Sequence, residues 1–172
     1  THCAGIVGGT GARSNGKNRG VAPGADLVGY GSGAVISILD AVGGLDYAAT
    51  NQFTYRNAIR VTSNSWGSSG TFDPLDPVSI ATYELYKRGI VSVFAAGNDG
   101  PSTTMGDPAR ASKVITVGAS NDVNELTTYT SLGPTAPGAD EDTKPDVLAP
   151  GGSFYRSGIL AADSNTNDGN TT

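Results

Sequence analysis

The feature that most constrains the fold is an almost continuously apolar segment, residues 90–96, which runs directly into Gly97 and Asn98. This segment is far shorter than the ~18 apolar residues that a membrane span requires. A short apolar run of this kind is typical of a central parallel strand buried on both faces. In an open α/β sheet, ligands bind beyond the carboxyl ends of the strands. The position of Asn98 therefore makes it a candidate site residue.

Strand-like and helix-like patterns alternate along the chain, which predicts a sheet covered by helices. Besides residues 90–96, strands are expected at residues 26–30, 59–63, 114–119 and 158–162. One helix is expected where apolar residues recur at helical spacing, namely Ile38, Val42, Leu45 and Ala49. A second helix is expected to begin with Asp76 as its cap and Pro77 in its first turn. Its core face carries Val78, Ala81 and Leu85, and it is expected to end at Lys87, Arg88 and Gly89.

Composition excludes several classes of protein. A chain of 172 residues with 37% hydrophobic residues indicates about one globular domain with a real core. The net charge of -5 and the absence of a basic cluster argue against binding to nucleic acid or to an anionic membrane. No stretch is long and apolar enough to span a membrane. The single cysteine, Cys3, excludes an internal disulfide framework.

Five short motifs follow one another over nearly the whole chain: THCAG at residues 1–5, GVAPGA at 20–25, SNSWG at 63–67, AAGNDG at 95–100 and KPDVLAPG at 144–151. In their order and spacing they resemble motifs of the subtilisin-like serine proteases, the subtilase or peptidase S8 family. Each motif alone is weak evidence. Together they make the resemblance specific.

The resemblance implies a three-layer αβα fold with a mostly parallel sheet, incomplete at both ends. Residues 1–172 would form a partial catalytic domain, beginning just after the catalytic histidine and ending before the nucleophilic serine. The parent protein is then expected to be a serine-type endopeptidase, a hydrolase that cleaves peptide bonds with an Asp/His/Ser triad. Because all three triad members lie outside these residues, the chain alone is expected to be inactive.

By the same resemblance, Asn98 donates a hydrogen bond to the oxyanion that forms during acyl transfer. The substrate is expected to pair as an added strand along Ser65, Trp66 and Gly67. The pocket for the side chain before the cleaved bond is expected to have Ala95, Ala96 and Gly97 as one wall and Gly106 near its base. On the other side of the substrate the resemblance places Gly31, Ser32 and Gly33.

Each of these assignments has a plainer alternative. Residues 98–100 are also a typical turn sequence, and Trp66 is also compatible with an ordinary, partly buried aromatic. Residues 31–33 equally fit a flexible glycine-containing loop. Asp107 would bias the pocket towards basic side chains, although a solvated carboxylate is the plainer expectation. The bond before Pro108 is expected to be cis, since the family often has a cis proline there.

Two further features resemble sites but are expected to be structural. His2, the only histidine, matches the second histidine of the family motif and not the catalytic one. Residues 163–169 resemble the start of a calcium-binding loop, but the glycine falls one position late. Both this segment and the acidic residues 140–142 are expected to be solvated surface.

Two other functions remain open at this stage. A nucleotide-binding domain is suggested by the glycines of residues 8–11, but that fingerprint needs a preceding strand and an acidic residue about 20 positions on. A catalytically inactive subtilase-like domain retained for binding is also compatible with a chain that lacks the triad. The presence of Asn98 argues against it, because such a domain has no need of an oxyanion donor.

The expected partner is a polypeptide substrate, with an N-terminal propeptide as a further expectation for the parent. The chemistry requires no cofactor and no metal site is assigned, although structural calcium in the parent is compatible with the resemblance. The resemblance also implies secretion to the extracellular space.

Overall fold

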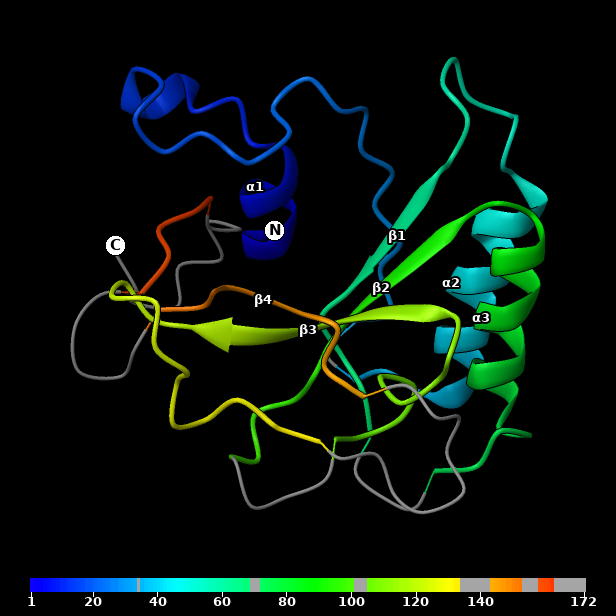
Figure 1. Cartoon of the computed structure of the whole chain (residues 1–172). Coiled ribbons are helices and arrows are strands. Elements are labelled where there is room, and N and C mark those ends of the chain that lie inside the picture. Colours follow the sequence, from blue (N-terminus) through cyan, green and yellow to red (C-terminus); the bar gives the residue numbers. More distant parts are fainter. Residues whose placement is uncertain (34, 69–71, 101–104, 134–142, 153–157, 163–172) are drawn as a thin grey trace. The chain divides into compact units, whose positions relative to one another are not determined.

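The computed structural model describes residues 1–33, 35–68, 72–100, 105–133, 143–152 and 158–162 (Figure 1). The chain divides into two compact units. One comprises Thr1–Gly31 together with the end of the chain from Phe154, and the other comprises Ser32–Ser153.

The first unit contains helix α1 (His2–Gly8) and a short 3-10 helix, η1 (Ala12–Ser14). The helix lies so close to Ala162 that a Cβ on Gly5 would be 2.9 Å from the Ala162 backbone nitrogen. The strands expected at residues 26–30 and 158–162 are not formed. Both segments have irregular, mostly exposed backbone, because neither has a ladder partner among the described residues.

The second unit is built on a parallel four-stranded sheet of β1 (Val61–Asn64), β2 (Val91–Ala95), β3 (Val114–Ser120) and β4 (Val147–Pro150). The strands lie in the order β1-β2-β3-β4, and every neighbouring pair is parallel. The expected strands at residues 59–63, 90–96 and 114–119 are thereby confirmed, with small shifts in their bounds. Strand β4 was not among the expected strands, because its KPDVLAPG sequence shows no alternation.

Both expected helices are present, as α2 (Ile38–Thr50) and α3 (Pro77–Lys87). Ser37 and Asp40 form a reciprocal capping box at the start of α2. At the start of α3, Asp76 accepts hydrogen bonds from two backbone nitrogens of the first turn. Beyond the end of α3, Gly89 has a φ of 73°, a left-handed conformation that glycine adopts without strain.

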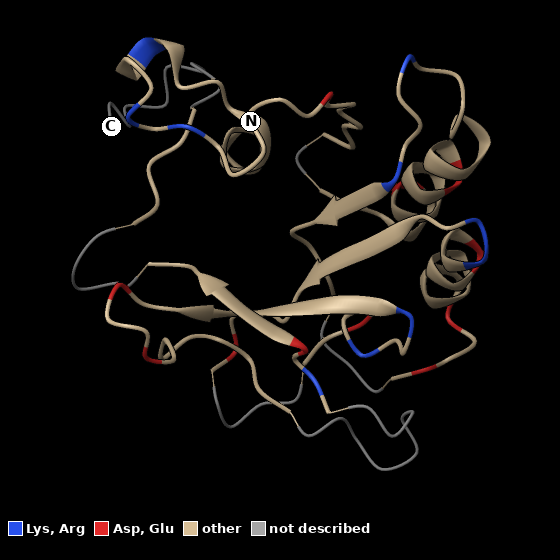
Figure 2. Cartoon of the chain, turned by 45° about the horizontal axis from the view of Figure 1, so that its top comes forward, with Lys and Arg blue, Asp and Glu red and all other residues tan. Residues whose placement is uncertain are grey.

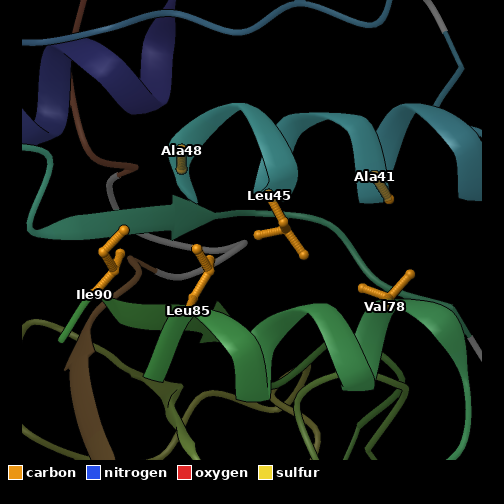
Figure 3. Close-up of a cluster of buried hydrophobic side chains, with 6 residues drawn as sticks. All are labelled: Ala41, Leu45, Ala48, Val78, Leu85 and Ile90. Carbon is orange, nitrogen blue, oxygen red and sulfur yellow. The ribbon is translucent and has the colours of Figure 1, made fainter. Parts of the chain in front are cut away.

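The helices bury their facing sides in one apolar cluster (Figure 3). Its members are Ala41, Leu45, Ala48, Val78, Leu85 and Ile90. The periodicity located the face of α3 correctly. For α2 the buried face is rotated, because Ala41 and Ala48 enter the cluster while Ile38, at the first turn, stays 60% exposed. Small alanines let the two helices approach closely.

Strand β2 lies between β1 and β3 as expected, but it is not buried on both faces. Ser92 and Phe94 are fully buried, whereas Val91 on the opposite face is 42% exposed. Strand β3 repeats this alternation, with Thr116 buried and Ile115 exposed. Among the described residues, the packing therefore covers one face of the sheet much more fully than the other.

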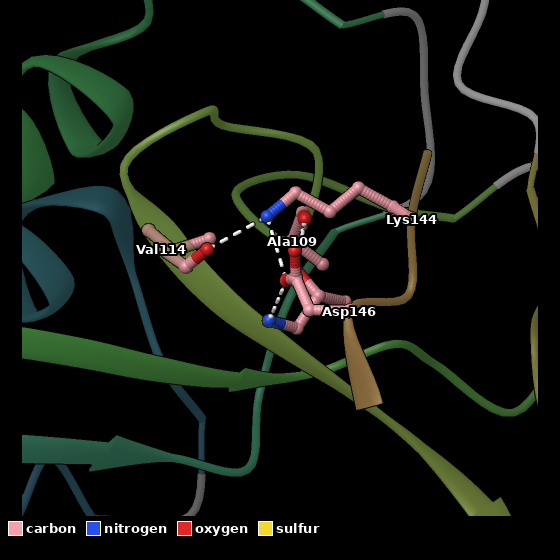
Figure 4. A network of polar contacts seen from close by, with 5 residues as sticks. Ala109, Val114, Lys144 and Asp146 are labelled. Carbon is pink, nitrogen blue, oxygen red and sulfur yellow. Dashed lines mark hydrogen bonds and ion pairs between the residues drawn. The ribbon is translucent and has the colours of Figure 1, made fainter. Parts of the chain in front are cut away.

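Strand β4 is attached to β3 by a buried charged group (Figure 4). The ammonium group of Lys144, whose side chain is only 2% exposed, donates to the Val114 carbonyl and to Asp146 Oδ2, each at 2.7 Å. The same Asp146 oxygen accepts from the Thr116 backbone nitrogen at 2.6 Å. These bonds hold the KPD segment against the start of β3.

Charged side chains of the second unit are spread over loops and helix ends, with both signs interspersed (Figure 2). Among the residues that the structure describes, no helix is long and apolar enough to cross a membrane.

Candidate functional site

Two of the expected site segments emerge at the same edge of the sheet. Asn64, the last residue of β1, is in register with Phe94 of β2, and the two strands are parallel. The segments that follow, residues 65–67 and 95–97, therefore leave neighbouring strands side by side. In open α/β sheets, ligands bind at this edge, beyond the carboxyl ends of the strands.

The segment after β1 is fixed by a buried amide and by an aromatic contact. Asn64 Nδ2 donates to Thr62 Oγ1 at 3.0 Å and to the Val93 carbonyl at 3.1 Å, which ties the end of β1 to β2. Two residues on, the Trp66 ring meets the Phe94 ring edge-on, with 5.1 Å between centroids. Trp66 packs against both apolar clusters, so the plainer interpretation of a partly buried aromatic holds, and it is compatible with a role in binding.

Residues 106–108 lie directly beside this segment. The Ser68 backbone nitrogen donates to the Asp107 carbonyl at 2.9 Å, and a Cβ on Gly67 would lie 2.9 Å from that same oxygen. Gly67 therefore has no room for a side chain on this side. The Asp107–Pro108 bond is cis, as expected. The structure thus brings Asp107, which follows Gly106 in the chain, next to the segment that was assigned to substrate binding.

Asp107 is not a plain solvated carboxylate. Its Oδ1 atom is buried and has no hydrogen-bond partner among the described residues. Burial raises the pKa of the Asp107 carboxyl, and this effect outweighs the neighbouring positive charge of Arg110, which lowers the pKa. A carboxyl that is buried and partly offset by Arg110 gives little support to a preference for basic side chains.

The segment after β2 forms a tight turn at residues 97–100. Gly97 has a φ of 111° and Gly100 a φ of 80°, so both ends of the turn use backbone conformations that favour glycine. Asn98, between them, is exposed. The side chain of Asn98 makes no hydrogen bond to any other described residue. Asn98 is thus an exposed side chain in the turn that follows β2.

The chain after β3 holds this turn in place, and sequence reasoning missed it. Ser131, which is completely buried, donates its backbone N–H to the Gly97 carbonyl at 3.0 Å and accepts from the Asp99 backbone nitrogen at 3.1 Å. The Gly100 nitrogen also donates to the Tyr129 carbonyl at 2.9 Å. Residues 129–131 carry only a polar loop composition, so nothing in the sequence indicated these contacts.

Other predicted residues are not brought to this edge. Gly31 belongs to the first unit, and Ser32 and Gly33 begin the second, so their place beside the substrate stays a prediction. His2 lies in α1, where its Nε2 atom donates to the Ile159 carbonyl at 2.9 Å. This bond agrees with the structural role expected for His2. Cys3 next to it is exposed and not in a disulfide.

The candidate calcium segments, residues 140–142 and 163–169, lie outside the described residues. Within the described part of the chain, no group of three or more His, Cys, Asp or Glu side chains is placed to hold a metal ion.

The parallel sheet, with polar turns at one edge and an exposed asparagine between two glycines, defines an α/β domain of the kind seen in subtilisin-like hydrolases. The family model of the subtilases matches residues 1–172, so the chain belongs to the subtilase family.

The chain is similar to two named bacterial proteases. It is 38% identical to serine protease AprX of Bacillus subtilis, over 88% of this chain and 37% of AprX. It is 34% identical to a calcium-dependent protease of a Nostoc species, over 77% of this chain and 22% of that protein. The chain thus spans little more than a third of AprX and less of the other relative.

Solved structures confirm the expected fold class. The structure named Sphericase matches with a TM-score of 0.70 and 28% identity, covering 94% of this chain and 55% of that one. The fold is therefore the subtilisin-like α/β fold.

Proposed function

We propose that this chain is part of a serine endopeptidase of the subtilisin type, in which Asn98 donates the side-chain hydrogen bond of the oxyanion hole. The Asp, His and Ser of the triad are then contributed by residues outside this sequence, and the chain by itself does not turn over peptides. The substrate is a polypeptide that pairs along Ser65, Trp66 and Gly67. Family membership supports the reaction type.

The observation that carries the proposal is the exposure and the hydrogen bonding of the Asn98 side chain. The residue is exposed at the carboxyl end of a central strand, and its amide is not used to build its own turn within the described residues. A neutral amide donates a hydrogen bond without changing its protonation state. Such a fixed donor stabilises negative charge as it develops on the scissile oxygen.

We assign the pocket walls to residues at this same edge of the sheet. Ala95, Ala96 and Gly97 are small residues beside the proposed oxyanion donor, and Gly106 lies near Gly67 through the Ser68–Asp107 contact. Small side chains on both sides leave space for a substrate side chain. In this proposal, residues 31–33 line the opposite side of the bound peptide.

The remaining features of the parent are proposed from the family. Structural calcium is supported by the calcium-dependent relative, without a site in the described residues. Secretion and an N-terminal propeptide are proposed on the resemblance to the family. The chemistry itself needs no cofactor.

The experiment is to replace Asn98 by Ala in the parent enzyme and to measure kcat and KM on a peptide substrate. We expect kcat to fall by ~10² to 10³ with KM nearly unchanged, because the amide meets the oxygen only once it is tetrahedral and negative. That magnitude is the loss found for the corresponding donor in subtilisin, a member of the same family. The 172-residue chain alone serves as the negative control for peptidase activity.

A second asparagine provides the matched control. Asn121 also lies in a turn directly after a parallel strand, and its side chain is committed to that turn. Asn121→Ala is expected to leave kcat and KM unchanged in the folded enzyme. If Asn98→Ala shifts only KM, or behaves like Asn121→Ala, then Asn98 is a binding or turn residue. A parent enzyme without peptidase activity would instead favour the inactive binding domain.

A further inference from the structure

We propose that Ser131 is the positioning residue of the oxyanion turn, and that it sets the direction of the Asn98 amide without touching the substrate. This inference rests on the proposed function of Asn98. It concerns a residue after β3 that belongs to none of the family motifs found in the sequence.

Ser131 holds the turn on both sides of Asn98. Its backbone N–H donates to the carbonyl of Gly97, and its hydroxyl oxygen accepts from the backbone nitrogen of Asp99. The two peptide units that flank Asn98 are therefore fixed by one residue. Within the described part of the chain, Asn98 contributes no side-chain bond to its own turn, so the turn depends on contacts from outside.

These contacts are dry and crowded. Ser131 is 0% exposed, so water does not compete for either of its hydrogen bonds. A Cβ added to Gly97 would lie 2.8 Å from the Ser131 hydroxyl oxygen, which leaves no space between the turn and the serine. The backbone of the turn at Gly97 therefore packs directly against the Ser131 side chain.

The serine is itself anchored to the sheet. Its neighbour Thr130, 1% exposed, accepts a hydrogen bond through Oγ1 from the backbone nitrogen of Ala119 in β3, at 3.0 Å. On the other side, the Tyr129 carbonyl accepts from Gly100. The segment 129–131 thus joins β3 to both ends of the turn after β2.

Loss of the Ser131 hydroxyl is expected to affect the transition state more than the bound substrate. Loss of the hydroxyl leaves the Asp99 N–H without its acceptor and loosens the peptide that follows Asn98. The bound ground-state substrate gains little from the oxyanion donor. A less well oriented Asn98 amide therefore lowers kcat more than it weakens substrate binding. A purely structural serine would lower the amount of folded enzyme but would not change kcat in this selective way.

The test compares Ser131→Ala with Asn121→Ala in the parent enzyme. Each variant removes a side-chain oxygen that accepts from the backbone after a strand, but the bonds of Asn121 lie within its own turn, after β3. We expect Ser131→Ala to lower kcat about tenfold, the effect of one lost hydrogen bond, with KM within about twofold. Asn121→Ala should lower the melting temperature, with kcat within about twofold of the parent.

A double-mutant comparison separates the two proposals. In the Asn98→Ala background, Ser131→Ala should change kcat less than twofold, because the side-chain amide that Ser131 orients is already absent. A full tenfold loss in that background, or equal kcat losses in Ser131→Ala and Asn121→Ala, overturns the role of Ser131. If Asn98→Ala alone leaves kcat intact, the proposed function itself fails. Should Ser131→Ala not fold, Ser131→Cys is judged by the same criteria, because its sulfur is a much weaker acceptor than the hydroxyl oxygen.

Discussion

Two asparagines follow neighbouring parallel strands in this fold, and their side chains are used differently. Asn121, after β3, accepts from the backbone nitrogens of Val123 and Glu125 at 3.0 and 2.8 Å. It also donates to the Glu125 carboxylate at 3.2 Å. Asn98, after β2, has no such bond within the described residues, and its turn is closed by residues 129–131. The first asparagine builds its turn, whereas the second is presented by a turn that others build.

The difference gives a criterion that distinguishes an asparagine that stabilises its turn from an asparagine that is a candidate site residue. Asparagine is common in turns because its side chain bonds to the nearby backbone and tolerates left-handed conformations. When a turn is held entirely by other groups, the asparagine is not required for stability there. An exposed asparagine amide that does not stabilise its own turn is then a candidate for a functional role.

The segment after β1 supplies the largest expected effect on stability. Trp66→Ala removes the edge-on contact with Phe94 and opens both apolar clusters. We expect the free energy of unfolding to fall by about 2 to 3 kcal/mol, less than the 3–5 kcal/mol for a fully buried tryptophan. In the parent enzyme KM should rise at least as much as kcat falls. Denaturant unfolding and steady-state kinetics measure the two quantities, with Trp66→Phe as the milder control.

A tryptophan variant that is destabilised but binds substrate normally would show that this segment is only part of the core. The contrast with the asparagine turn would then be sharper, since only the segment after β2 would carry function.

The two asparagines themselves predict a smaller difference in stability. Asn121→Ala loses the acceptor for two backbone N–H groups, and we expect it to cost about 1 kcal/mol of unfolding free energy. Asn98→Ala should stay within about 0.5 kcal/mol of the parent chain, the range of an unremarkable surface change. Thermal or denaturant unfolding of the 172-residue chain measures both. Equal losses would contradict the division between a turn-building and a presented asparagine.

How far the sequence predicted this structure depended on whether a signal was local. The cap at Asp76, the end of α3 at Gly89 and strand β2 were predicted correctly, because each depends on adjacent residues. Residues 26–30 carried a similar strand signal but formed no strand, since a strand also needs a ladder partner and none lies among the described residues. A local pattern specifies which backbone is favoured, and pairing decides whether it forms.

The candidate site was predictable to the same extent. Asn98 followed from its position after β2 and from the family motif. The hydrogen bonds of Ser131 to this turn could not be predicted, because a serine 33 positions away in a polar loop has no periodicity or motif to mark it. Burial on one face of β2 was also missed, since an apolar run does not reveal what covers each side.

The smallest expected effect concerns the pH dependence of stability at Asp107, beside Gly67. Burial raises the pKa of this carboxyl, so the folded chain holds the proton more tightly than the unfolded chain does. Stability should therefore fall as the pH rises from about 4, near the ordinary pKa of aspartate, through the raised pKa of the folded state. Asp107→Asn removes the charge, so it should raise the melting temperature near pH 7 and lose this advantage below about pH 4.

Asp40 provides a control of opposite sign. The hydrogen bonds from Ser37 lower the pKa of the Asp40 carboxyl, so its contribution to stability is present above the ordinary pKa and is lost as the pH falls. Asp40→Asn should thus lower the melting temperature near pH 7 and approach the parent chain in acid. Melting curves of the three chains between pH 3 and 8 test both signs. If Asp107→Asn is destabilising at pH 7, the attraction of Arg110 outweighs the burial, and Asp107 helps to hold the segment after β1 in place.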